Sequence, residues 1–146
     1  MNIRHILRVS VCLLLAGCDG QLEVSGIKPG SEEFGRFPEV MRQFPVWQPI
    51  DTPEYDFEVR DGARKPSGGI RYTTGLKPEE IIQLFQSSAE SLNCQLNQSE
   101  DHQVQYMCDN DPARGLELYI RSVSASDTEV NILFLETTPE FEKVSF

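Results

Sequence analysis

The stretch KPEEIIQLFQSSAESLNCQLNQSEDHQVQYMC, from Lys77 to Cys108, decides the fold of this 146-residue chain. Its first half predicts a helix, because apolar residues recur every three or four positions and line one face: Ile81, Phe85, Ala89 and Leu92. Pro78 suits the first helical position, where its missing N–H would have no intrahelical partner. Glu79 and Glu80 add negative charge at the positive end of the helix dipole.

The second half of this stretch predicts a β-hairpin closed by a disulfide. Polar and apolar residues alternate in two runs that flank a polar turn. If the hairpin is centred on Asp101, Cys94 lies directly opposite Cys108, and Leu96 lies opposite Tyr106. Opposed residues in an antiparallel pair have Cα atoms about 4.5–5.5 Å apart, which a disulfide can bridge. The strand register and the cysteine spacing therefore agree on a Cys94–Cys108 bond.

Alternation of apolar and polar residues predicts four further strands. Two precede the helix, over residues 55–59 and 70–74, and two follow the hairpin, over residues 116–122 and 130–135. The last run is mostly apolar, as is typical of a strand buried on both faces. We expect one α+β domain with two layers: an antiparallel sheet of about five or six strands, with one main helix packed on one face. The expected core is Ile81, Phe85, Leu92, Leu96, Tyr106, Leu118, Ile120, Ile132 and Phe134.

The N-terminus predicts a secretory signal peptide. Arg4 and Arg8 form a basic head, an apolar run follows, and small residues precede the expected cleavage site. The four residues Leu15-Ala16-Gly17-Cys18 resemble the lipobox of bacterial lipoproteins. The resemblance covers this N-terminal segment alone, and it implies cleavage before Cys18, a lipid on the Cys18 thiol and an acylated new N-terminus. Two or more acyl chains suffice for stable membrane anchoring, whereas one chain binds marginally.

The lipobox resemblance sets the domain organisation and the localisation that we expect. Residues 1–17 form the signal peptide, residues 18–35 the lipidated cysteine and a flexible tether, and residues 36–146 a single periplasmic domain. Asp19 follows the lipobox directly, and in some Gram-negative bacteria similar lipoproteins with aspartate there stay in the inner membrane. In others the rule differs, so the inner and the outer membrane both remain open. Either membrane places the domain in the periplasm.

Processing of this kind would leave two cysteines and a strongly acidic chain. Cys12 leaves with the signal peptide and Cys18 carries lipid. Cys94 and Cys108 remain as an even pair in an oxidising compartment, where disulfides persist. Without the two leader arginines, 11 basic residues (13 − 2) face 23 acidic ones, a net charge of −12. This charge argues against nucleic-acid binding and permits a basic protein partner.

Residues 34–49 combine aromatic side chains with three prolines. One or two helical turns fit before Pro45, which would end them. Two interpretations stay open for this segment. It packs against the domain, as aromatic loops usually do, or it exposes a strip for a partner that includes Phe44 and Trp47.

The residues that commonly carry catalysis are sparse in the mature chain. His102 is the one histidine beyond residues 1–17, and it falls in the predicted hairpin turn. A catalytic histidine needs a nucleophile and a third group beside it, and a zinc site needs several Cys or His ligands. Asp109-Asn110-Asp111 favours a turn, because an EF-hand also requires a set spacing and a closing glutamate. We therefore expect no enzyme activity, no metal and no cofactor.

These patterns favour a non-enzymatic protein-binding module held at the membrane by lipid on Cys18. In size, location and cysteine usage it is similar in kind to periplasmic immunity lipoproteins, which neutralise toxins delivered between bacteria, for example by type VI secretion. The candidate contact residues are the acidic hairpin tip, Glu100 and Asp101, and the aromatic pair, Phe44 and Trp47. Two alternatives remain: a structural accessory of a cell-envelope or secretion complex, and an enzyme acting on peptidoglycan or lipid.

Overall fold

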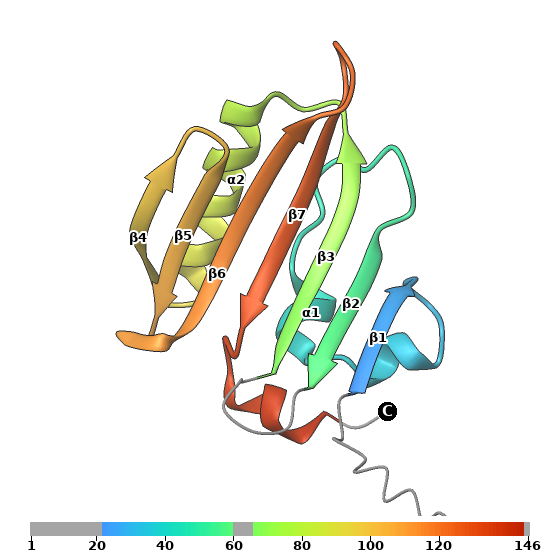
Figure 1. Ribbon diagram of the computed structural model, residues 1–146, viewed down its shortest axis with the longest axis vertical. Coiled ribbons are helices and arrows are strands. Elements are labelled where there is room, and N and C mark those ends of the chain that lie inside the picture. Colours follow the sequence, from blue (N-terminus) through green and yellow to red (C-terminus); the bar gives the residue numbers. More distant parts are fainter. Residues whose placement is uncertain (1–21, 60–65, 145–146) are drawn as a thin grey trace, which may run out of the picture.

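The computed structural model describes residues 22–59 and 66–144, which form one antiparallel sheet with helices on one side (Figure 1). The strands are β1 (Leu22–Ile27), β2 (Glu54–Val59), β3 (Ser67–Thr74), β4 (Cys94–Glu100), β5 (Gln103–Cys108), β6 (Asp111–Ser122) and β7 (Thr128–Leu135). The helices are α1 (Glu39–Gln43) and α2 (Pro78–Ser91), with 3₁₀ turns η1 (Glu33–Arg36) and η2 (Pro139–Lys143).

The seven strands lie in the order β1-β2-β3-β7-β6-β5-β4. Strands β4 to β7 follow one another as hairpins, and β7 then pairs with β3 over eight residue pairs, from Ser67↔Leu135 to Thr74↔Thr128. The α2 helix connects β3, inside the sheet, to the edge strand β4. The predicted α+β class with one antiparallel sheet and one main helix is confirmed, but the sheet has seven strands where five or six were expected.

The additional strand, β1, lies in the segment that was expected to be a tether. It pairs with β2 and contains a bulge between Val24 and Ile27, where Gly26 adopts φ +68°. The Gly26 N–H donates to Oδ1 of Asp56 at 2.8 Å, so a β2 side chain holds the bulge. The sequence pattern did not reveal this strand, because Gly26 interrupts its alternation and its pairing depends on β2. Part of the segment expected to be a tether thus forms β1 and η1, while Cys18 and the signal peptide lie outside the described residues.

The α2 helix buries the predicted face, formed by Ile81, Phe85 and Ala89, against the sheet. At its start the Glu80 carboxylate accepts a hydrogen bond from the Lys77 N–H at 2.9 Å. The expected core is confirmed with two exceptions: Leu92 is partly buried, and Leu96 is 59% exposed. Leu96 belongs to the edge strand β4, in which Cys94 alone is buried.

The aromatic segment before β2 packs in the same layer as α2, behind the sheet as drawn in Figure 1. Phe37 and Met41 are buried and Phe44 is 6% exposed. The Phe44 ring lies 5.2 Å from the Phe134 ring in an edge-to-face contact, a geometry that adds to the energy of burial. Trp47 is partly buried against the same cluster, 6.0 Å from Phe44. The packed interpretation of this segment is confirmed, because Phe37, Met41 and Phe44 belong to the core.

No described element covers the other face of the sheet, which points toward the viewer in Figure 1. In β7 the side chains of Val130, Ile132 and Phe134 are buried, and the residues between them are partly exposed. The prediction that this strand is buried on both faces is wrong, because all the helices lie on one side. Within residues 22–59 and 66–144, no helix is long and apolar enough to span a bilayer.

Candidate binding surface on the uncovered sheet face

Three adjoining hollows cross the uncovered face of the sheet. The largest, about 850 Å³, lies beside the tip of the β4–β5 hairpin and extends over β6 and β7. Two smaller ones, of about 240 and 190 Å³, lie over β2 and β3, and the last also reaches β1. Glu129 lines the first and second hollows and Asn131 the first and third, so the three are contiguous. We call them together the acidic trough.

The acidic trough is lined by more carboxylates than cations. Its acidic residues are Glu23, Asp51, Glu54, Asp56, Glu58, Glu100, Asp101 and Glu129, and its lysine and arginines are Lys28, Arg71 and Arg121. Two of these cations already bind a carboxylate of the trough. Such a surface attracts positively charged groups and repels anionic ones.

The two arginines show how the trough holds a cation. Arg121 donates two hydrogen bonds to the Glu129 carboxylate, at 3.1 and 2.9 Å, from the neighbouring strand. Arg71 donates to Glu54 at 3.1 Å, and this bond, with the charge of Asp56, raises the pKa of Arg71. Both ion pairs are solvent-exposed, so they contribute little to stability.

A tyrosine in the largest hollow supplies an aromatic surface among these charges. The Tyr119 hydroxyl donates to the Glu117 carboxylate at 2.6 Å and accepts a hydrogen bond from Gln103 Nε2 at 2.9 Å. Burial, followed by the bond to Glu117, raises the pKa of Tyr119 to about 12. The phenol is therefore neutral at physiological pH and held in one orientation. A neutral, fixed ring of this kind can stack against a lysine or arginine side chain.

The predicted hairpin-tip residues lie at one end of the trough. Glu100 and Asp101 are exposed and line the largest hollow together with His102. The His102 carbonyl accepts a hydrogen bond from the Ile120 N–H at 3.0 Å, which ties the tip to β6. The structure thus brings Glu100 and Asp101 onto one surface with acidic residues of three other strands, β1, β2 and β7, and with Asp51. In the described part of the chain, no three His, Cys, Asp or Glu side chains are grouped so that they could hold a metal.

The predicted aromatic pair lies on the opposite side of the sheet from the trough. Phe44 is buried, and Trp47 is fixed through its backbone, since its carbonyl accepts a hydrogen bond from Thr74 Oγ1 at 3.0 Å. The structure therefore separates the two sets of candidate contact residues. The hairpin tip belongs to the acidic trough, and the aromatic pair belongs to the packed helical layer.

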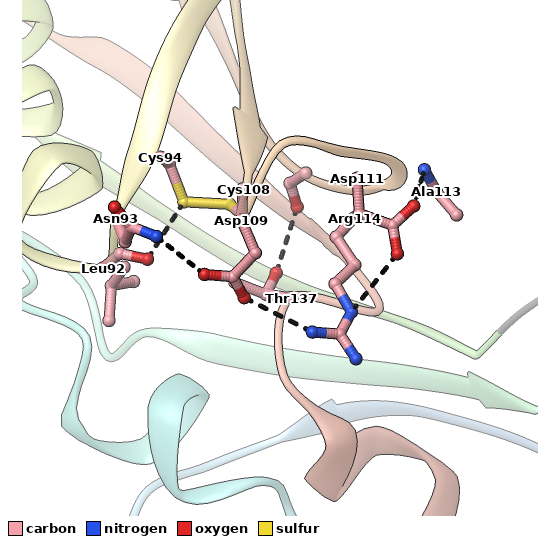
Figure 2. A network of polar contacts seen from close by, with 10 residues as sticks. Leu92, Asn93, Cys94, Cys108, Asp109, Asp111, Ala113, Arg114 and Thr137 are labelled. Carbon is pink, nitrogen blue, oxygen red and sulfur yellow. Dashed lines mark hydrogen bonds and ion pairs between the residues drawn. A yellow bond between two sulfur atoms is a disulfide. The ribbon is translucent and has the colours of Figure 1, made fainter.

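The disulfide predicted at the base of the hairpin is confirmed: Cys94 and Cys108 are bonded and directly opposed (Figure 2). The turn itself contains two residues, Asp101 and His102, because Glu100 pairs with Gln103. A two-residue turn alone would move the cysteines out of register. The bulge between Leu96 and Gln98 adds one residue to β4 and restores the opposition.

A polar network supports the disulfide from the next turn (Figure 2). Asp109 accepts hydrogen bonds from Asn93 Nδ2 at 2.9 Å and from an Arg114 guanidinium nitrogen at 3.3 Å. Asp109 and Asn110 have φ values of +54° and +55°, which Asp and Asn tolerate better than most residues. The predicted turn at residues 109–111 is confirmed, and its carboxylates bind the protein's own donors. This network joins the end of α2 to the β5–β6 turn.

Sequence reasoning missed most of the trough. Glu54, Asp56 and Glu58 alternate with buried residues along β2, so their common face was readable from the sequence. Arg71 and Glu129 lie on strands β3 and β7, and nothing in the sequence indicates that these strands are neighbours. Their contribution to the same surface required the tertiary structure.

No protein-family model, no curated protein and no solved structure is detectably similar to this chain. Its class is therefore described by its fold and its candidate site alone. It is an α+β domain whose seven-stranded antiparallel sheet has helices on one face and an acidic trough on the other.

Proposed function

We propose that this protein is a non-enzymatic binding module that holds a basic protein partner in its acidic trough. The observation that carries the proposal is the uncovered sheet face, on which eight carboxylates and three cationic side chains line contiguous hollows. Charge complementarity of this kind accelerates encounter with a basic partner and disfavours acidic ones. In the bound complex, lysine and arginine side chains of the partner would lie beside these carboxylates and the Tyr119 ring.

We further propose that the module acts in the periplasm as a lipid-anchored protein that neutralises an interbacterial toxin. The lipobox-like Leu15-Ala16-Gly17-Cys18 supports the anchor, and the acidic trough suits a basic toxin surface. Replacing Cys18 with serine should release the protein from the membrane fraction, and retention of this variant would refute lipid anchoring. A neighbouring gene for a secreted toxin would support the immunity role, whereas one for envelope machinery would favour a structural accessory.

The binding surface can be tested with oligolysine as a defined basic probe and with matched charge reversals. In the ¹⁵N-labelled full-length protein, oligolysine at low salt should shift the amide signals of trough residues. The double variant Glu100→Lys/Asp101→Lys should weaken this binding by about tenfold, since each exposed ion pair is worth up to about 1 kcal/mol. Glu33→Lys/Glu90→Lys is the control, because it changes net charge equally at exposed positions outside the trough.

Two results would contradict the proposal. Shifts spread evenly over all acidic surfaces would mean that net charge alone attracts the probe. Equal weakening by the trough variant and by its control would lead to the same conclusion. Binding that falls with added salt, and that is lost selectively in the trough variant, would support a directed site.

A further inference from the structure

A second hollow lies on the helix side of the sheet, where α1, the end of α2 and η2 meet. Its volume is about 390 Å³, within the range of roughly 300–1,000 Å³ that is usual for small-ligand sites. Its apolar lining includes Val40, Phe44 and Leu92, of which Phe44 is buried and the other two are partly buried. We call it the helix-side groove.

Carboxylates supply the charged part of this lining. Glu39 and Glu140 are both exposed, and no basic residue of the described chain lines the groove. The Glu140 carboxylate accepts a hydrogen bond from the Glu39 N–H at 3.0 Å, which fixes η2 against the start of α1. The groove therefore combines apolar side chains with negative charge.

We propose that the helix-side groove binds a short segment of a partner polypeptide in which an apolar side chain lies next to lysine or arginine. The apolar side chain contacts Val40, Phe44 and Leu92, and the cation lies beside Glu39 and Glu140. This site is separate from the acidic trough and does not depend on the function proposed for it.

The test uses capped tripeptides and amide shifts of the ¹⁵N-labelled full-length protein. The peptide acetyl-Lys-Phe-Lys-amide should cause saturable shifts in residues 39–45, 88–92 and 138–140. Acetyl-Lys-Ser-Lys-amide lacks the apolar side chain and should bind at least about tenfold more weakly. Acetyl-Glu-Phe-Glu-amide reverses the charge and should also bind more weakly.

Two adjacent serines provide a matched pair of variants. Ser87 and Ser88 each donate a hydrogen bond to the carbonyl four residues earlier in α2, but Ser88 alone lines the groove. Ser88→Phe should fill the groove and abolish the saturable shifts, whereas Ser87→Phe should retain them.

Several outcomes would overturn this assignment. Equal binding of the acidic and basic tripeptides would remove the role of Glu39 and Glu140. Equal effects of Ser87→Phe and Ser88→Phe, or no saturable shift with any peptide, would show that the groove is not the site. Shifts that depend on protein concentration without peptide would assign the groove to contacts between copies of this chain.

Discussion

Replacing Gly68 with alanine should destabilise the fold, whereas the same change at Gly69 should not. The two glycines are adjacent in β3, so a side chain at one points to the helices and at the other to the trough. A Cβ at Gly68 would lie closer than 3.0 Å to Sδ and Cε of Met41, which is fully buried. A Cβ at Gly69 would meet its nearest atom, in Leu133, at 3.6 Å, an ordinary contact.

The two variants together isolate the packing cost. Replacing glycine by alanine restricts the unfolded chain in both cases, a stabilisation of about 0.4–1 kcal/mol. Forcing an extra methyl group into a filled core costs about 1–3 kcal/mol, because the surrounding side chains must leave their preferred rotamers. The free energy of unfolding should therefore be about 1–3 kcal/mol lower in Gly68→Ala than in Gly69→Ala.

Urea denaturation of the full chain, followed by Trp47 fluorescence and circular dichroism, measures this difference. A double variant with Met41→Ala adds an independent check. Met41→Ala alone should cost about 2–5 kcal/mol. It should cost less in the Gly68→Ala background, because the new methyl group occupies part of the space that Met41 leaves. Equal stability of Gly68→Ala and Gly69→Ala would refute the tight packing of the Met41 side chain against β3.

Three further predictions concern stability. Replacing Cys94 and Cys108 by alanine should lower the free energy of unfolding by about 3 kcal/mol, because the disulfide restricts a loop of roughly fifteen residues in the unfolded chain. An unchanged urea midpoint would contradict this prediction. Phe44→Ala should cost about 3–5 kcal/mol and Trp47→Ala less, since Phe44 is the more deeply buried; the reverse order would show that Phe44 lies at the surface. Burial raises the pKa of Tyr72 from 10.0 to about 12, so the Tyr72 hydroxyl loses its proton at lower pH in the unfolded chain than in the folded one. The free energy of unfolding should therefore fall as the pH rises from about 10 to about 12. Tyr72→Phe should reduce that slope in urea titrations at several pH values, and an unchanged slope would assign it to other groups.

The residues that act locally were predictable from the sequence. The buried face of α2 follows from residues three or four positions apart, and these are neighbours in any helix. The Cys94–Cys108 bond follows from a hairpin whose strands adjoin in the chain. The acidic tip, Glu100 and Asp101, lies at the end of β4 and in the turn of this hairpin. In each case the residues that contact one another are close in the sequence, so the sequence pattern predicts the contact.

Strand β1 was not predictable in the same way. Its alternation of Leu22 and Val24 with polar residues is interrupted by the positive-φ residue Gly26, and its hydrogen-bond partners on β2 lie some thirty residues further on. The aromatic segment was ambiguous for a related reason. Its composition shows that it is apolar, but the burial of Phe44 depends on Phe85 and Phe134, which are distant in the chain.

The sequence by itself determined the helix, the hairpin with its disulfide, and which residues share the buried face in β2, β5 and β6. Only the tertiary structure decided that β3 pairs with β7 and that all the helices lie on one side of the sheet. These two facts bring Arg71 and Glu129 onto one surface and leave that surface uncovered. The physical reason is that the spacing of apolar residues predicts on which side of a helix or strand each residue lies. Whether another layer covers that side depends on contacts between segments that are far apart in the chain.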